Sequence, residues 1–122
     1  MTLLATLELD ERQGVTVASI SGEIDLSDAG ELQATISDAV PNHAAGLVID
    51  LREVTYLDSA GVALLFELAR RVARRQQQLG IVVPREAPVR EILHLSGAAD
   101  SLALHAALDE ALERIIPTAA ES

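Results

Sequence analysis

Two blocks of alternating apolar and polar residues open the chain. From residue 3 to residue 9 every odd-numbered side chain is apolar, which is the period of a half-buried β-strand. Residues 10–14 are polar and end in Gly14, so they predict a turn. The β-branched run Val15–Ser21 predicts a second strand. We therefore expect the chain to begin with a β-hairpin.

The period changes from two to about four after residue 28. Asp28 and Glu31 have the spacing of a capping box, which predicts that a helix begins there. Apolar residues then recur along one stripe of this helix: Leu32, Ile36 and Val40. Pro41 followed by Asn42 predicts the end of the helix.

A buried strand and a long helix come next. Residues 47–51 are almost continuously apolar, which predicts a buried strand, and residues 54–57 offer an extension of it. A helical pattern begins directly after Ser59, and Gly80 is expected to end it. Its predicted inner face is apolar: Leu65, Leu68, Val72 and Leu79. Arginines crowd its C-terminal half, where the helix dipole favours cations, and we interpret them as a solvated face: Arg70, Arg71, Arg74 and Arg75.

The last third of the chain continues this alternation. It predicts a strand at residues 81–83, a helix at 89–95, a strand at 102–106 and a helix at 109–116. Pro88 suits the start of the first of these helices, and Gly97 suits its end. Strands that alternate with helices predict a layered α/β domain whose strands are parallel beyond the first hairpin. A length of 122 residues fits a single domain over residues 1–122.

Composition narrows the classes of function. Apolar residues make up 49% of the chain, as expected of a globular domain. With no cysteine, disulfides, thiolate metal sites and thiol nucleophiles are excluded. No apolar run approaches the roughly 18 residues that span a bilayer, and the N-terminus has no secretory pattern. We therefore predict a cytoplasmic protein that does not insert into a membrane.

The charge is acidic and unevenly distributed. A net charge of −10 argues against nucleic acid as a partner, because a phosphate backbone requires a basic surface. Residues 1–61 hold 11 acids and 2 arginines, a net −9, whereas residues 62–122 hold 8 acids and 7 arginines, a net −1. Two interpretations stay open: a charge that serves solubility, or an acidic docking face for a basic partner.

Ser59 is placed where a strand meets the start of a helix. Free backbone N–H groups and the positive end of the helix dipole favour an anion at such a position. A phosphate on Ser59 would stand beside the acidic Asp58, so its charge would also create repulsion. The ordinary alternative is that Ser59 is the N-cap of its helix, worth about 1 kcal/mol of stability.

The residues present argue against two functions, a serine hydrolase and a phosphate-accepting receiver domain. A serine hydrolase would require G-x-S-x-G, but position 57 is leucine, and the sheet would have to be much larger. Asp50, which the pattern places at the end of a buried strand, suggests the phosphate acceptor of a response-regulator receiver. That chemistry also requires an acidic pair after the first strand and a lysine, and the chain contains no lysine.

Neither a metal site nor a cofactor site is predicted. The three histidines lack short metal-binding spacing: His43, His94 and His105. The glycines do not form a phosphate-binding loop. We therefore predict a protein that is not an enzyme and carries no cofactor.

The segment from Asp50 to Gly61 resembles the signature of the STAS domain family, above all that of the small bacterial anti-sigma factor antagonists. That signature reads D-L-x-x-V-x-x-L-D-S-x-G, and it is matched by Asp50, Leu51, Val54, Leu57, Asp58, Ser59 and Gly61. Two further landmarks agree in order and spacing, the stretch Gly22-Glu-Ile-Asp25 and the stretch Leu93-His-Leu-Ser-Gly97. The resemblance extends from about residue 3 to residue 116.

The resemblance implies a fold, a function and a site. The fold would be a mixed sheet of four or five strands, with an N-terminal hairpin and helices mainly on one face. The protein would bind an anti-sigma factor that is also a serine kinase, and phosphorylation of Ser59 would end the binding until a serine phosphatase reversed it. The implied partner surface consists of Gly22, Asp25, Asp58, Ser59 and Gly61. The alternative is a STAS regulatory subunit of a lipid or anion transporter, or of a stress-signalling assembly.

Overall fold

The computed structural model describes residues 5–116, so the predicted strand start at Leu3 and the last residues of the chain lie outside the described residues. The elements follow in this order: β1 Ala5–Arg12, β2 Val15–Ile24, α1 Leu26–Ala39, β3 Gly46–Leu57, α2 Ser59–Arg74, β4 Gln78–Val82, α3 Pro88–Leu95, α4 Ala98–Ser101, β5 Leu104–His105 and α5 Leu108–Ile115. The predicted elements are all present, and the short helix α4 is an addition.

The strands form one mixed sheet in the order β1-β2-β3-β4-β5. β1 and β2 make the predicted antiparallel hairpin, with Leu7 opposite Ile20. The remaining neighbours are parallel, because a helix connects each strand to the next. The prediction of a mixed four- or five-stranded sheet is confirmed.

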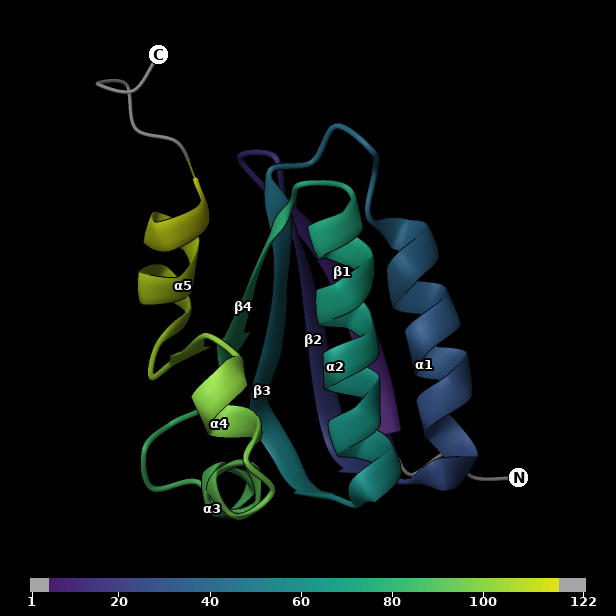
Figure 1. Cartoon of the computed structure of the whole chain (residues 1–122), viewed down its shortest axis with the longest axis vertical. Helices are drawn as coiled ribbons and strands as arrows, with labels where there is room; N and C mark the ends of the chain where they lie inside the picture. Colours follow the sequence, from purple (N-terminus) through teal and green to yellow (C-terminus); the bar gives the residue numbers. More distant parts are fainter. Residues whose placement is uncertain (1–4, 117–122) are drawn as a thin grey trace.

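The helices cover the two faces of the sheet unequally. α1 and α2 lie side by side on one face, and α5 lies on the other (Figure 1). The larger core joins the sheet to α1 and α2, and its biggest fully buried side chains include Ile20, Ile36, Leu47, Ile49 and Leu65. A smaller core lies under α5: Val15, Val17, Val48, Val82, Ala111, Leu112 and Ile115. Helices are therefore mainly on one face, as predicted, with α5 as the exception.

The spacing of the core-facing residues changes along the central strand β3. Leu47, Ile49 and Leu51 are spaced by two and face the larger core, whereas Val54 and Leu57 follow at spacings of three. The pairing of β2 with β3 shifts register at two points along this stretch. Each bulge adds one residue and turns the strand, so that the later apolar side chains still face the helices. β3 therefore runs through the whole of residues 46–57.

The helix boundaries correct two predictions. α1 begins at Leu26 with Asp25 as its N-cap, so the predicted capping box at Asp28 is wrong. α2 ends at Arg74 and not near Gly80, which makes Leu79 part of strand β4. The predicted end of α3 is confirmed, because Gly97 has a φ of 83° just beyond it.

α2 ends early because the backbone turns left-handed at Gln76, with a φ of 60°, and the buried Gln77 anchors this turn. The side-chain amide of Gln77 donates to the carbonyl oxygens of Pro41 at 2.8 Å and Ala44 at 3.1 Å. These bonds tie the end of α2 to the loop between α1 and β3, where the loop carbonyls are shielded from water. A continued helix would carry Gln77 away from that loop. Across residues 5–116, no helix combines the length and the apolar character that crossing a bilayer requires.

Candidate partner-binding site at the start of helix α2

Two strands end side by side and lead directly into two helices. Ile24 at the end of β2 pairs with Leu57 at the end of β3, and the backbone N–H of Asp58 donates to the Ile24 carbonyl at 3.1 Å. α1 begins two residues after Ile24, and α2 begins two residues after Leu57. The N-termini of both helices therefore meet at one end of the sheet (Figure 1). The structure thus brings Asp25, Asp58 and Ser59 together.

Asp58 holds the two helix starts. One carboxylate oxygen accepts hydrogen bonds from the backbone N–H groups of Ala60 at 2.9 Å and Gly61 at 3.1 Å. The other oxygen accepts from the N–H of Leu26, the first residue of α1, at 3.3 Å. Asp58 is therefore the N-cap of α2 and also a link to α1.

This geometry corrects the interpretation of Ser59 as an N-cap. Ser59 is the first residue of α2, and its side chain is exposed. Three of the N–H groups expected to receive a phosphate are already used, because Ala60 and Gly61 donate to the Asp58 side chain and Val62 donates to the Asp58 carbonyl. A phosphate on Ser59 would gain from the helix dipole but would stand beside a bound carboxylate. Repulsion from Asp58 is therefore a stronger consequence than the sequence indicated.

The capping roles lead to a stability prediction. Replacing Asp58 with alanine removes the α2 cap and the bond to Leu26, so we expect the free energy of unfolding to fall by about 1–2 kcal/mol. Replacing Ser59 with alanine removes only an exposed hydroxyl, and we expect a change within about 0.5 kcal/mol. Urea denaturation followed by circular dichroism measures both. A larger loss for the Ser59 variant than for the Asp58 variant would contradict this assignment of the cap.

Asp25 has the corresponding role in α1. Its carboxylate accepts from the N–H of Ser27 at 2.9 Å, and its backbone carbonyl accepts from the N–H groups of Asp28 and Ala29. Asp25 is partly exposed at the same end of the molecule as Ser59. Any loss of partner binding in an Asp25 variant therefore has to be compared with its loss of stability.

The two predicted site glycines have local structural reasons. Gly22 has a φ of 96°, a conformation that side chains other than glycine adopt at a cost. At Gly61 an added Cβ would lie 2.8 Å from the Cβ of Leu57 and 3.2 Å from the carbonyl oxygen of Ile24. Gly61 is therefore required where α2 starts against the ends of β2 and β3. Both residues shape the site, and neither presents a side chain to a partner.

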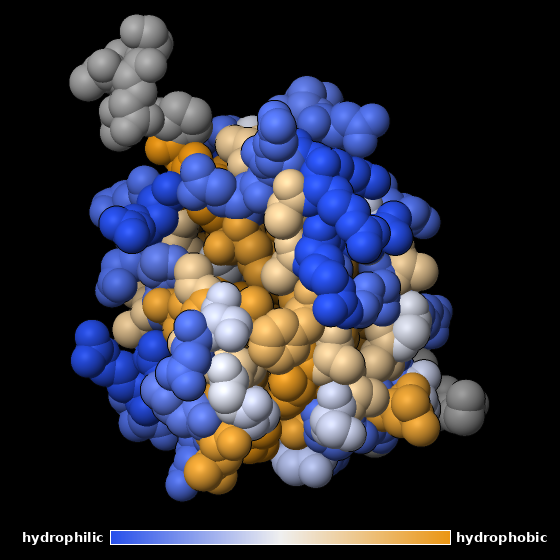
Figure 2. All heavy atoms as spheres, in the orientation of Figure 1, coloured by the Kyte–Doolittle hydropathy of each residue, from blue (hydrophilic) through white to orange (hydrophobic). Residues whose placement is uncertain are grey.

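An apolar groove lies beside Ser59, and the sequence pattern did not predict it. The groove has a volume of about 410 Å³, and it is lined by Tyr56, Leu57, Asp58, Ser59, Val62, Ile92, Leu95 and Ser96. Three of the four large apolar side chains that stay exposed in residues 5–116 surround this helix start: Leu26 at 79%, Tyr56 at 47% and Leu95 at 82%. Figure 2 shows apolar side chains at the lower end of the face that carries α2. Such a cluster is a candidate interaction surface.

A model of the STAS domain family matches residues 6–111 of the chain. The chain belongs to the STAS domain family. The anti-sigma-F factor antagonist RsfB of Mycobacterium tuberculosis is 34% identical over 107 residues, covering 88% of this chain and 86% of RsfB.

Solved structures agree with the family. The crystal structure of an anti-sigma factor antagonist from Mycobacterium paratuberculosis matches with a TM-score of 0.81 and 32% identity, covering 93% of this chain and 95% of that one. A sulfate transporter family protein from Wolinella succinogenes matches with a TM-score of 0.70 and 19% identity, covering 85% and 86% of the two chains. The second likeness shows a shared fold alone.

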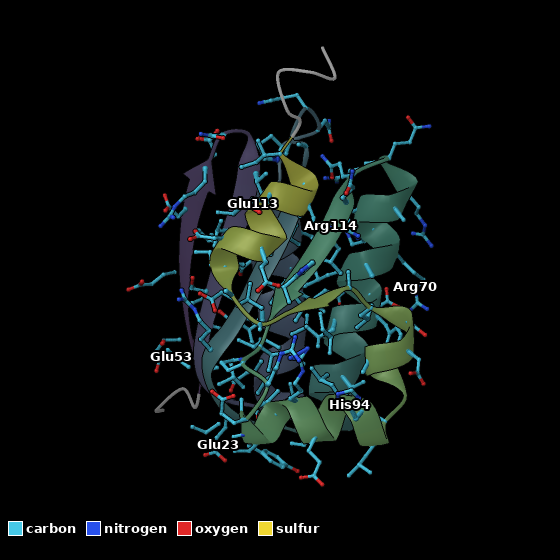
Figure 3. All side chains as sticks on the ribbon, turned by 90° about the vertical axis from the view of Figure 1, so that its left-hand side faces the viewer. Glu23, Glu53, Arg70, His94, Glu113 and Arg114 are labelled. Carbon is cyan, nitrogen blue, oxygen red and sulfur yellow. The ribbon has the colours of Figure 1, made fainter. Side chains whose placement is uncertain are left out.

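Acidic and basic side chains occupy opposite ends of α2 in this STAS domain. Glu23, Asp25 and Asp58 lie near its start, where β2 and β3 end. In Figure 3 Glu23 lies at the lower end of the domain, and Arg70 lies higher up on the side of α2. The arginines of the C-terminal half are exposed, as predicted, although Arg70 pairs with Glu67 and Arg75 donates to the Val40 carbonyl at 3.1 Å. The end of the domain that carries Ser59 is therefore the acidic end.

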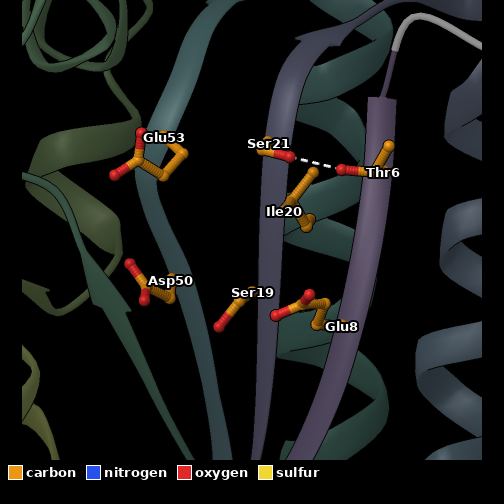
Figure 4. Close-up of a pocket in the computed structure, with 7 residues that line it drawn as sticks. All are labelled: Thr6, Glu8, Ser19, Ile20, Ser21, Asp50 and Glu53. Atoms are coloured by element: carbon orange, nitrogen blue, oxygen red, sulfur yellow. Dashed lines mark hydrogen bonds between the residues drawn. The ribbon is translucent and has the colours of Figure 1, made fainter.

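Asp50 does not have the position of a phosphate acceptor. It lies within β3 and not at its end, on the sheet face opposite α1 and α2 (Figure 4). Its buried carboxylate accepts three hydrogen bonds from the Arg52 side chain, at 2.7, 2.9 and 3.1 Å. These bonds raise the pKa of the Arg52 guanidinium. A structural ion pair therefore accounts for this aspartate, and the expectation that it ends the strand is wrong.

The same sheet face carries a shallow row of polar side chains. Ser19 and Ser21 of β2 lie between acids of the neighbouring strands, Glu8 on β1 and Glu53 on β3, and the hydroxyls of Ser21 and Thr6 are hydrogen-bonded (Figure 4). Within residues 5–116, no three histidine, cysteine or acidic side chains are grouped so that they could hold a metal ion. We assign no chemistry to this row.

Proposed function

We propose that this STAS domain is an anti-sigma factor antagonist, which binds an anti-sigma factor with serine kinase activity and so releases a sigma factor to RNA polymerase. The support from relatives is the pair of anti-sigma factor antagonists that exceed 30% identity over most of the chain. In this function the protein is a binding module and a substrate rather than an enzyme. It acts in the cytoplasm, where RNA polymerase operates.

The proposal rests on the exposure of Ser59 and on the groove beside it. Its hydroxyl is exposed on the first residue of α2, so a kinase can reach it without unfolding the domain. It also lines the groove that contains Tyr56 and Leu95, so a protein that docks on these apolar side chains covers Ser59. One surface therefore serves for docking and for modification.

The proposed switch is electrostatic. Phosphorylation of Ser59 adds a charge of about −1.5 to −2 at neutral pH. Asp58 and Asp25 already place carboxylates at this end of the domain, so the modified surface becomes strongly anionic. A partner that covers the groove would have to desolvate this charge, which is unfavourable without a matched cation. The complex therefore dissociates, and a serine phosphatase restores binding.

Phosphorylation assays test this proposal. Each anti-sigma factor of the kinase class from the source organism is incubated with the protein and ATP, and the products are mapped by mass spectrometry. One phosphate on Ser59 is expected, with none on the Ser59→Ala variant. Ser27→Ala is the matched control, because Ser27 is an exposed serine in the first turn of the neighbouring helix α1.

Two outcomes would contradict the proposal. Labelling of Ser59→Ala at another residue to the same extent would show that Ser59 is not the regulated position. Absence of phosphorylation, combined with stable binding to a membrane transporter component, would instead favour a STAS regulatory subunit of a transporter.

A further inference from the structure

The groove beside Ser59 is bounded by apolar side chains from two elements. Tyr56 comes from the end of β3 and Leu95 from the end of α3, and both are exposed although they line the same groove. Val62 and Ile92 add partly buried apolar surface between them. An aliphatic side chain of a partner that entered the groove would therefore meet apolar groups from β3, α2 and α3 at once.

An exposed acid stands beside this groove. Glu23 on β2 is the register partner of Tyr56 on β3, and paired residues of neighbouring strands point to the same face of a sheet. The Glu23 carboxylate and the Tyr56 ring are therefore neighbours, and both are exposed. Figure 3 shows Glu23 at the lower end of the domain, where α3 also lies. Among residues 5–116, no basic side chain forms an ion pair with Glu23.

The charge of this end selects a cation, and the neighbouring ring selects an arginine. Asp25 and Asp58 add negative charge, but their carboxylates already cap α1 and α2, so Glu23 is the acid available for direct contact. A guanidinium can donate two hydrogen bonds to a carboxylate while its flat face rests on a tyrosine ring. A lysine ammonium has no flat face to stack.

We propose that the anti-sigma factor docks through a segment that places an aliphatic side chain between Tyr56 and Leu95 and an arginine against Glu23 and Tyr56. The identity of the partner rests on the proposed function, whereas the complementarity of the surface to such a segment does not. Ser59 lines the groove and Glu23 does not, so a phosphate on Ser59 would face the aliphatic side chain while Glu23 holds the arginine. The phosphate would then be buried without a matched cation.

Two leucine variants test the apolar part. With an anti-sigma factor that phosphorylates Ser59, Leu95→Ser is expected to lower the affinity at least about tenfold in calorimetry. Leu9→Ser is the matched control, because Leu9 is also an exposed leucine but lies on the edge strand β1 and does not line the groove. Equal affinity of the two variants, or dimerisation of the chain that depends on Leu95, would overturn the proposal.

Two glutamate variants test the arginine. Glu23→Gln is expected to lower the affinity about threefold and to reduce the dependence of the affinity on salt, because a screened charge contact is lost. Glu11→Gln removes an exposed acid from β1 and should bind as wild type does. If Glu23→Gln has the affinity and the salt dependence of Glu11→Gln, no partner cation is bound at Glu23.

A titration without the partner tests the surface alone. Tyr56 is the only tyrosine and the chain has no tryptophan, so tyrosine fluorescence reports directly on the groove. N-acetyl-leucyl-glycyl-arginine amide should give a saturable change, together with amide shift changes at Val62 and Leu95. The same peptide with glutamine for arginine, or with glycine for leucine, should bind more weakly.

The titration also separates this inference from the proposed function. Equal or unsaturated responses to the three peptides would overturn the complementarity of the surface, even if Ser59 is phosphorylated. If no kinase modifies Ser59, the proposed function fails, and the titration still decides whether the groove and Glu23 bind an aliphatic side chain and an arginine.

Discussion

Ser59→Glu is expected to weaken binding to the anti-sigma factor at least about tenfold, or about 1.4 kcal/mol. The new carboxylate would stand beside Asp58 at the edge of the groove that contains Tyr56 and Leu95. A docked partner would have to remove water from two adjacent negative charges, which is unfavourable. Isothermal titration calorimetry with wild type and variant measures the difference.

Two controls separate this effect from general damage. Ser59→Ala should bind as wild type does, because no charge is added and the α2 cap is Asp58. Ala73→Glu adds the same charge to an exposed position near the far end of α2, and it should also bind normally. Equal affinity of wild type and Ser59→Glu would contradict a charge switch at this position.

Phosphorylation of Ser59 should change amide chemical shifts slightly beyond the residues that contact the phosphate. The Asp58 carboxylate bonds to the N–H groups of Ala60 and Gly61 on α2 and to that of Leu26 on α1. A phosphate on Ser59 competes for the same donors, so amide shift changes are expected at Leu26 as well as around Ser59. Changes that spread to β4 and α5 would instead indicate a rearrangement of the whole domain.

Gly61→Ala is expected to lower the free energy of unfolding by about 1–3 kcal/mol. The added Cβ would lie 2.8 Å from the Cβ of Leu57 and 3.3 Å from Cγ2 of Ile24, so the start of α2 would have to move away from the sheet. Thermal and urea unfolding followed by circular dichroism measure the loss.

Gly30→Ala is the matched control for this prediction. Gly30 lies within α1 on its exposed side, and a Cβ built there has no neighbour within 4 Å. Alanine at an exposed helical position is more favourable than glycine by up to about 1 kcal/mol, so stability should rise. Glycine to alanine is therefore expected to lower the free energy of unfolding at position 61 and to raise it at position 30. A stabilising Gly61→Ala would contradict the close packing.

The amino-acid sequence by itself determined the order and type of the elements other than the short helix α4. Two patterns carried this information: the alternation of apolar residues in the first strand, and the helical stripe through Leu32 and Ile36. Both depend only on residues two to four positions apart, so they reflect local backbone geometry. The sequence also placed Ser59 at the start of a helix, because a buried strand and an amphipathic pattern meet there.

Only the tertiary structure decided how that helix start is built. Asp58 replaces Ser59 as the cap and also bonds to Leu26, 32 residues away, because Ile24 pairs with Leu57 in the sheet. The exposure of Leu95 could not be read from its helical stripe, since burial depends on what other elements cover. Periodicity shows which side chains share a face, but contacts between distant segments show which of them remain free to bind a partner.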